Sequence, residues 1–130
     1  RPGSFDRVLV DAPCTGLGAL RRRPESRWRR RPEDVPGLVP LQEALLDAAL
    51  DSTRPGGVVV YATCSPVVEE TAGVVQAVLS RRTDTVLEPA PSLLPEAVDA
   101  ESAHLPGALQ LWPHRHGTDA MFVALLRRAR

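Results

Sequence analysis

The sequence contains no lysine, so arginine supplies all 16 of its positively charged side chains. An equal number of acidic residues, 16, brings the formal net charge to zero, although the charge is unevenly distributed along the chain. No apolar run approaches the ~20 residues of a membrane-spanning helix, and no signal peptide is visible. These absences are typical of a soluble intracellular protein, for which we expect a cytoplasmic location and no contact with a membrane.

Cysteine is also scarce, and the chain contains only Cys14 and Cys64. Without a secretory signal, two cysteines favour reduced thiols over a disulfide. A metal site is not expected, because His104, His114 and His116 lie in one loop at no recognised ligand spacing. We interpret these histidines as surface residues. A thiol-redox pair of the two cysteines is an alternative, but the absence of a Cys-x-x-Cys arrangement disfavours it.

The chain has 130 residues, which is about the size of one domain. It begins at Arg1, not at Met, and its first apolar segment resembles a strand from the middle of a longer protein. We therefore expect a fragment or a processed piece of a longer protein.

Short β-rich runs alternate with helical patterns along the chain. Arg7–Val10 and Val58–Cys64 are apolar throughout, as expected for parallel strands that are buried on both faces. Further strands are predicted at Thr85–Glu88, at Ala108–Leu111 and, as the last strand, at Ala120–Arg128. This alternation of strands and helices predicts a doubly wound α/β sheet.

Two helices are predicted between these strands. The first covers residues 38–52 and ends at "RPGG", Arg54–Gly57. Its expected buried face is Leu38, Leu41, Leu45, Ala48 and Ala49. The second helix runs from Pro66 to about Arg82, with Glu69 and Glu70 complementing its N-terminal dipole. Its expected buried positions are Val67, Val74, Val75, Val78 and Leu79.

Polar and thiol side chains follow the ends of the first two strands. Asp11 and Cys14 come after the first strand, and Cys64 and Ser65 come at the end of the second. Ligands of doubly wound sheets bind beyond the carboxyl ends of the strands. If the two strands are parallel neighbours, both thiols lie at the same rim of the sheet.

Each cysteine has two interpretations. A buried cysteine often acts as a small hydrophobic residue in the core. At a junction between a strand and a loop, however, a thiol lies near a helix N-terminus or loop amides, which favour the nucleophilic thiolate. Cys14 follows Pro13 and Cys64 lies between Thr63 and Ser65, so both occupy such junctions.

A second feature is "RRRPESRWRRR", Arg21–Arg31, which we call the arginine segment. It contains seven arginines and one acidic residue, Glu25, so its charges cannot neutralise one another locally. It is either a solvated loop or a surface for RNA, because clustered arginine with an aromatic residue suits phosphate contacts and base stacking. Trp28 either stacks on a base or anchors the loop by packing. The predicted RNA contacts are Arg21, Arg22, Arg23, Arg27, Trp28, Arg29 and Arg30.

Asp11 stands at the end of a predicted buried strand, where a carboxylate needs partners. It either caps the following turn or forms a hydrogen bond with a cofactor or substrate at the rim. The "GLG" at Gly16–Gly18 is too short to be a phosphate-binding loop and carries little weight.

Two motifs together resemble the Sun-type (Nop/Sun, RsmB-like) RNA cytosine-5 methyltransferases: "DAPCTGLGALRRRPESRW" and "PGGVVVYATCSPVVEE". The resemblance extends from about Phe5 to Arg128 and includes the terminal "HGTDAMFVALLRR". Two cysteine motifs in this order are specific, because DNA cytosine-5 methyltransferases use only the Pro-Cys motif for the nucleophile.

The resemblance implies a role for each residue of the rim. Cys64 would be the nucleophile that attacks C6 of cytosine, and Cys14 would assist release of the methylated product. Asp11 would contact the cofactor, S-adenosylmethionine. The substrate would be RNA, with ribosomal RNA favoured and transfer RNA as an option, and the target base would have to be unpaired or flipped out.

The resemblance also implies a fold, the C-terminal half of a Rossmann-like class I methyltransferase sheet, mostly parallel with an antiparallel last strand. The Gly-rich cofactor loop of that fold has no counterpart here, so residues 1–130 are expected to be a partial catalytic domain. Two smaller departures are "EET" at Glu69–Thr71 and Ala120-Met121 after Asp119. The alternative is a non-catalytic RNA-binding module, or an inactive fragment, that retains the fold.

Overall fold

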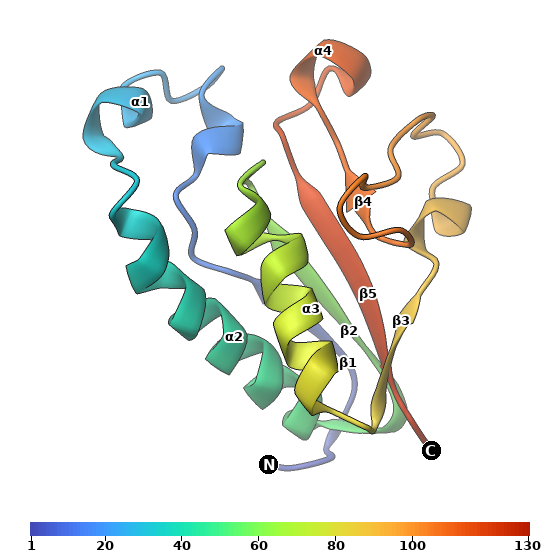
Figure 1. The fold of residues 1–130 in the computed structure, drawn as a ribbon. Helices are drawn as coiled ribbons and strands as arrows, with labels where there is room; N and C mark the ends of the chain where they lie inside the picture. Colours follow the sequence, from blue (N-terminus) through green and yellow to red (C-terminus); the bar gives the residue numbers. More distant parts are fainter.

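The apolar runs of the sequence form one mixed sheet. The computed structural model describes residues 1–130. Its strands are β1 (Phe5–Asp11), β2 (Thr53–Thr63), β3 (Thr85–Glu88), β4 (Leu109–Gln110) and β5 (Phe122–Arg128). They follow the order β1-β2-β5-β3, with the short β4 also paired to β5 (Figure 1). All five predicted strands are therefore confirmed.

The direction of the strands also agrees with the prediction. β1 and β2 are parallel, whereas β5 runs antiparallel to both β2 and β3. The sheet is thus mixed, with its last strand antiparallel, in an α/β architecture. The register pairs Asp11 with Ala62, so β1 and β2 end at the same rim.

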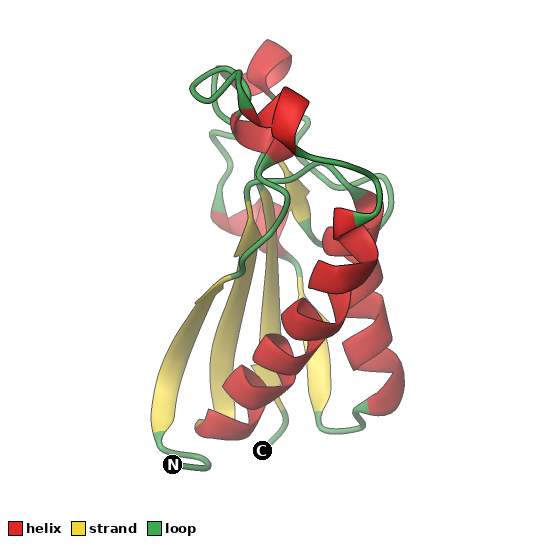
Figure 2. Cartoon of the chain, turned by 90° about the vertical axis from the view of Figure 1, so that its left-hand side faces the viewer, coloured by secondary structure: helices red, strands yellow, loops and turns green.

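The helices connect the strands along one side of the sheet. They are α1 (Ser26–Arg29), α2 (Asp34–Ser52), α3 (Ala72–Arg81) and α4 (Pro113–His116). Both long helices, α2 and α3, cover the same face (Figure 2). The chain moves from β1 to β2 and then to β3 in one direction across the sheet, and right-handed crossovers in one direction place their helices on one face.

The main hydrophobic core lies between this face and the two long helices. Val59 and Tyr61 of β2 and Phe122 of β5 are fully buried there. The Tyr61 and Phe122 rings meet edge to face with centroids 6.3 Å apart. Helix α3 contributes Val74, Val75 and Val78, as predicted.

The buried face of α2 was predicted wrongly. Leu41 and Leu45 are 48% and 37% exposed, whereas Leu46 and Leu50 are completely buried. Of the five predicted positions only Ala49 is buried. Leucines four residues apart occur on two faces of this helix, so spacing alone did not distinguish them. The helix also ends at Ser52, before "RPGG", which already belongs to β2.

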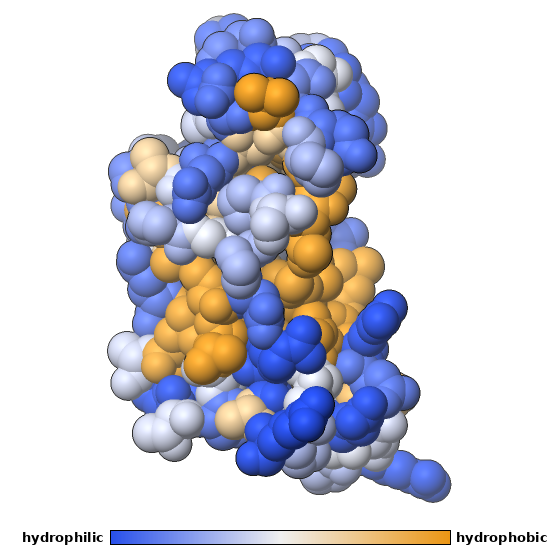
Figure 3. Space-filling view, turned by 90° about the vertical axis from the view of Figure 1, so that its right-hand side faces the viewer, coloured by the Kyte–Doolittle hydropathy of each residue, from blue (hydrophilic) through white to orange (hydrophobic).

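The opposite face of the sheet is less covered. Leu9 of β1 is 67% exposed, so the prediction that this strand is buried on both faces was wrong. The cause is the position of β1 at the edge of the sheet, on a face that α2 and α3 do not cover. Figure 3 shows apolar side chains gathered at mid-height on the side of the molecule where β3 and β5 lie.

None of the helices is sufficiently long and apolar to span a lipid bilayer.

Candidate active site

The two cysteines meet beyond the carboxyl ends of β1 and β2. Their Sγ atoms lie 3.6 Å apart, and both thiols are half-buried. The backbone amide of Ala12 donates to the carbonyl of Ala62 at 3.0 Å, which extends the parallel pairing to the residues just before the cysteines. The predicted meeting of the thiols at one rim is therefore confirmed.

The environment of Cys14 favours its protonated form. Burial raises the pKa of Cys14 to about 12, and the negative charge of a neighbouring Cys64 thiolate acts in the same direction. At neutral pH Cys14 therefore keeps its proton, and a hydrogen bond joins the two thiols, in which either sulfur can be the donor. A protonated thiol next to a potential thiolate is an arrangement suited to a nucleophile and its partner.

A buried carboxylate joins the two loops that carry the cysteines. Glu70 accepts hydrogen bonds from the backbone N–H and the hydroxyl of Thr15, both at 2.7 Å. It also accepts from the hydroxyl of Ser65 at 2.6 Å and from the side-chain amide of Gln42 at 3.2 Å. Thr15 follows Cys14 and Ser65 follows Cys64, so a single completely buried side chain positions both junctions.

This role of Glu70 differs from the predicted one. As a helix-dipole residue it would lie at the surface, but the helix is interrupted at Thr71 (φ −119°, ψ −101°), with a 3₁₀ turn at Val68–Glu70 before it. The hydroxyl of Tyr61 donates to the backbone carbonyl of Glu70 at 2.8 Å and helps to hold the turn. The available signal was a hydroxyl residue directly after each cysteine, which indicates a shared acceptor.

Gly18 allows the first loop to approach the second strand. Its amide donates to the carbonyl of Cys64 at 2.9 Å, and its carbonyl accepts from the amide of Ala120 at 2.8 Å. A Cβ at this position would lie 2.0 Å from the Ala120 oxygen, so no other residue fits without movement of the backbone. The "GLG" therefore matters for close packing, a role that sequence reasoning missed.

Comparison with known proteins agrees with this geometry. The model of the family described as "16S rRNA methyltransferase RsmB/F" matches residues 2–127. This chain belongs to the RsmB/F methyltransferase family. The Mycobacterium tuberculosis protein Rv1407 is 61% identical over 128 residues, 98% of this chain and 27% of that protein. Ribosomal RNA small subunit methyltransferase B of Pectobacterium carotovorum is 41% identical over 122 residues, 94% of this chain and 26% of that protein.

Solved structures also resemble the RsmB/F chain. The crystal structure of PH0851 has a TM-score of 0.89 and 35% identity over 98% of this chain and 27% of that chain. The structure of NSun6 from Pyrococcus horikoshii with SFG has a TM-score of 0.81 and 31% identity, covering 98% of this chain and 31% of that one. These neighbours share the Rossmann-like fold. The chain spans 26–27% of the length of the curated relatives described above.

In this RsmB/F chain Asp11 is exposed, so its carboxylate does not need the partners that the end of a buried strand would require. It lies at the rim beside the cysteine loops but its carboxylate forms no hydrogen bond within the chain, so the interpretation as a cap for the following turn is not supported. An exposed, unpaired carboxylate at the carboxyl end of a strand is available to a ligand. Its contact with a cofactor stays a prediction.

The arginine segment divides into paired and unpaired residues. Arg21 donates to Asp119 at 2.7 Å, and Arg22 forms a forked contact with the same carboxylate, its shortest distance being 2.6 Å. The Arg22 hydrogen bonds lower the pKa of Asp119, which keeps it ionised. As expected, the charges within the segment do not pair with one another, but two of its arginines share the carboxylate of Asp119, which comes from a distant part of the chain. The arginines without an acidic partner are Arg23, Arg27, Arg29, Arg30 and Arg31.

Trp28 is 83% exposed, so its interpretation as a packing anchor is wrong. The guanidinium of Arg27 lies 5.4 Å from the centroid of its ring. Beside it a groove of about 550 Å³ extends from Thr15 to the start of α2. Leu17, Val35 and Val67 give this groove apolar walls, and three arginines of the arginine segment line it: Arg27, Arg30 and Arg31. We call it the arginine groove.

The histidines do not form a metal centre. The structure contains no group of three or more histidine, cysteine, aspartate or glutamate side chains that could hold a metal ion. His104 and His114 are exposed, in agreement with the prediction. His116 is half-buried, because its Nδ1 accepts from the amide of Trp112 and its Nε2 contacts the carbonyl of Val98.

Proposed function

We propose that this chain is a catalytic part of an S-adenosylmethionine-dependent RNA cytosine-5 methyltransferase, with residues 1–130 forming a partial catalytic domain. The observation that carries the proposal is the pair of thiols 3.6 Å apart at the rim of a methyltransferase sheet. Membership of a family described as 16S rRNA methyltransferases supports RNA, and ribosomal RNA in particular, as the substrate. Transfer RNA is the second choice, and a cytoplasmic location belongs to the same proposal.

Cys64 is the nucleophile in this proposal. Its thiolate adds to C6 of the target cytosine, so that an S–C6 bond forms and the electrons of the C5–C6 double bond move to C5. C5 then takes the methyl group, and the proton on C5 leaves to a base. Loss of that proton restores the C5–C6 double bond and breaks the S–C6 bond, which returns Cys64 as a thiolate. A soft thiolate suits this reversible addition better than a hydroxyl.

Cys14 assists the elimination step of this reaction, in which the S–C6 bond breaks. Before the addition its proton is held by burial and by the negative charge of Cys64. Once Cys64 is bonded to C6 it no longer carries that charge, which removes the smaller of these two causes and favours Cys14 as the base.

The residues of this chain fit one edge of a cofactor site. S-adenosylmethionine supplies an electrophilic methyl group when it is bound. The exposed carboxylate of Asp11, at the rim beside Cys14, is the side chain proposed to contact it. The structural neighbour solved with SFG, an S-adenosylmethionine analogue, supports this choice of cofactor. The chain has no Gly-rich cofactor loop, so Asp11 accounts for only part of such a site.

The RNA backbone follows the arginine segment. Unpaired guanidinium groups attract phosphates, and the exposed ring of Trp28 offers a surface on which a base stacks. Arg23, Arg27, Arg29 and Arg30 are proposed as the principal phosphate contacts. Arg21 and Arg22 hold the segment to Asp119 and contribute to the same positive field.

The test is a covalent adduct with RNA that contains 5-fluorocytosine. In 5-fluorocytosine, C5 carries fluorine in place of hydrogen, so after methyl transfer there is no proton to lose. The S–C6 bond therefore persists, and the complex survives denaturing electrophoresis. The experiment requires the longer protein that carries the cofactor site. Cys64→Ala should abolish the adduct, whereas Cys14→Ala is the matched control and should retain it.

With ordinary cytosine the two variants should differ in the same sense. Cys14→Ala should accumulate covalent RNA, because it forms the S–C6 bond but resolves it slowly. An undiminished adduct in Cys64→Ala would sink the assignment of the nucleophile. RNA binding without any adduct in the wild type would instead favour the non-catalytic RNA-binding module.

A further inference from the structure

A second cleft lies close to Cys64 and is not part of the arginine groove. It has a volume of about 310 Å³, which is within the range of small-ligand sites. One wall is formed by Pro66 and Thr71, and the other comes from residues 101–115, including Trp112 and His114. We call it the tryptophan cleft.

The segment after Cys64 separates the two depressions. Val67 and Glu69 line the arginine groove, whereas Pro66 and Thr71 line the tryptophan cleft. In Figure 1 the segment that leads into α3 lies between α1 on one side and α4 on the other. An RNA strand that passes from one depression to the other therefore crosses the segment that directly follows Cys64.

The tryptophan cleft has the side chains that recognise an unpaired base. The rings of Trp112 and His114 lie 5.9 Å apart between centroids, at an angle of 43°. The backbone at Trp112 is held in place, because its amide donates to Nδ1 of His116 at 2.9 Å. Arg115, also at the cleft, is exposed and has no acidic partner. Aromatic rings beside a free guanidinium suit a base and its phosphate.

We propose that the tryptophan cleft binds the nucleotide next to the target cytosine, with its base stacked on Trp112 and His114. This inference rests on the proposed function, since it assumes that the target base lies at Cys64. It adds a site on the opposite side of Cys64 from the arginine segment. The RNA is then held on both sides of the base that reacts, which is how a single nucleotide can be kept out of its stack.

Tryptophan fluorescence tests the contact without requiring methylation. Trp28 and Trp112 are the only tryptophans of the chain. In the Trp28→Phe variant the emission comes from Trp112 alone, and a single-stranded RNA with one central cytosine should quench it. The same RNA with an abasic site beside the cytosine should restore the emission. Binding of both RNAs is followed separately by anisotropy of a label on the RNA.

These readouts distinguish the two proposals. If the RNA binds by anisotropy but the Trp112 emission does not change, the cleft is not a nucleotide site, and the proposed function still stands. If no RNA binds, both proposals are overturned. An adduct with 5-fluorocytosine RNA in the longer protein that carries the cofactor site, without quenching of Trp112, likewise rejects only the cleft.

A variant series measures the strength of the stacking. Trp112→Ala should weaken RNA binding about tenfold, since stacking on one aromatic ring contributes that much. Trp112→Phe keeps a ring and should retain most of the affinity, and the exposed Leu93→Ala serves as the control outside the cleft. The abasic RNA should bind the wild type and Trp112→Ala equally. A further loss of affinity for abasic RNA in Trp112→Ala would overturn the proposal.

Discussion

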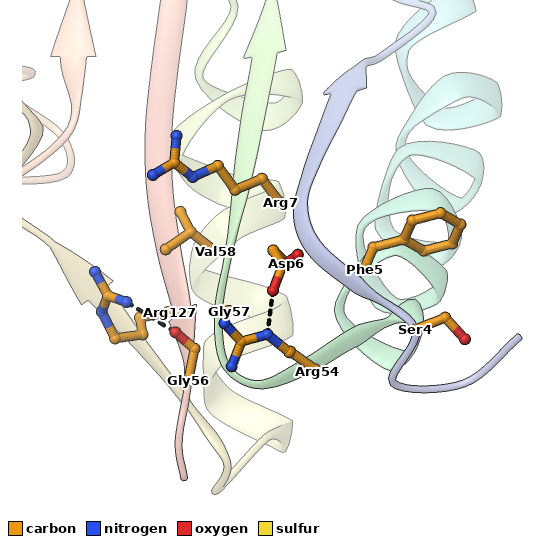
Figure 4. Close-up of a pocket in the computed structure, with 9 residues that line it drawn as sticks. All are labelled: Ser4, Phe5, Asp6, Arg7, Arg54, Gly56, Gly57, Val58 and Arg127. Carbon is orange, nitrogen blue, oxygen red and sulfur yellow. Dashed lines mark hydrogen bonds and ion pairs between the residues drawn. The ribbon is translucent and has the colours of Figure 1, made fainter.

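Arginine occurs at both ends of the sheet, but its partners differ between them. At the end away from the cysteines Arg54 pairs with Asp6 and Arg127 with Glu88. Both arginines line a concavity of about 760 Å³ (Figure 4), in which the Arg54–Asp6 pair and the contact of Arg127 with the Gly56 carbonyl are visible. At the cysteine end most of the arginine segment has no acidic partner. The same residue type therefore supports structure at one end and is free for a ligand at the other.

The carboxylates of the two ends differ as well. Asp84, at the end away from the cysteines, is 37% exposed, and hydrogen bonds from Arg82 lower its pKa to about 2. Glu70, at the cysteine end, is completely buried and accepts from a backbone amide, two hydroxyls and a side-chain amide. Exposed ion pairs tolerate change because water replaces either partner. A buried carboxylate surrounded by neutral donors does not, because each donor it loses stays unsatisfied.

The two buried side-chain atoms without a hydrogen-bond partner also lie at the cysteine end. They are Oε1 of Gln42 and Oγ1 of Thr63, the residue before Cys64. Unpaired buried polar atoms are uncommon and concentrate where function limits packing. The cysteine end therefore positions the side chains of the candidate active site, whereas the ion pairs of the other end stabilise the fold.

Replacing one carboxylate at each end should give the largest contrast. Glu70→Gln should destabilise the fold by about 2–3 kcal/mol, because the amide cannot accept from all four donors. Glu88→Gln removes a partly exposed partner of Arg127 and should cost about 1 kcal/mol or less. Urea unfolding monitored by circular dichroism measures both. Glu69→Gln, an exposed neighbour of Glu70, is the control for the charge change.

Equal losses for Glu70→Gln and Glu88→Gln would show that the buried network has no special weight. A loss for Glu69→Gln as large as that for Glu70→Gln would show that charge, not position, explains the effect.

Glycine substitutions should sharpen the contrast at the cysteine end. Gly18→Ala places a methyl group 2.0 Å from the Ala120 oxygen, and overpacking of this kind costs about 1–3 kcal/mol. Gly37, in the first turn of α2, has open space around it. Gly37→Ala should stabilise the helix by up to about 1 kcal/mol, since alanine is the better helix former. Thermal unfolding should shift in opposite directions for the two variants, and a shift of the same sign would contradict the close approach at Gly18.

Arginine substitutions at the two ends should differ in their effect on RNA binding, and we expect their free-energy changes to be the smallest of the three comparisons. Arg29→Ala with Arg30→Ala removes two unpaired charges and should lower RNA affinity. The slope of log affinity against log salt should become shallower by about 0.7 for each phosphate of a single strand that the protein no longer neutralises. Arg54→Ala with Arg127→Ala removes the same charge from the other end and should leave that slope unchanged, as measured by anisotropy over a series of salt concentrations. If both double variants reduce the slope equally, the RNA does not prefer the cysteine end.

Local patterns predicted most of the fold. The short apolar runs at Val8–Val10 and Val58–Ala62 became strands, because they are rich in β-branched residues and are bounded by turn residues. The meeting of Cys14 and Cys64 followed from the same reasoning, since parallel neighbours end at one rim. Helix α2 shows the limit, because its leucines lie on two faces and the choice of Leu46 over Leu45 depends on what the helix packs against.

The site was predicted in part for a similar reason. Cys14 and Cys64 carry their chemistry in their own residue type and in their position after a strand. Glu70 does not, because its sequence context also suits a surface helix start, and only its contacts with Thr15 and Ser65 reveal its role. Asp119 was missed as the partner of Arg22 because the two are 97 positions apart.

The sequence by itself determined the strands of an α/β sheet, the two thiols at one rim and the positive charge of the arginine segment. These properties follow from apolar runs, residue type and local charge density, which depend on neighbours in the chain. The tertiary structure decided that Glu70 joins the two cysteine loops, that Asp119 pairs with Arg21 and Arg22, and that the segment after Cys64 separates two depressions. The physical reason is that a buried hydrogen bond or ion pair depends on which distant groups packing brings together, and local sequence does not encode that choice.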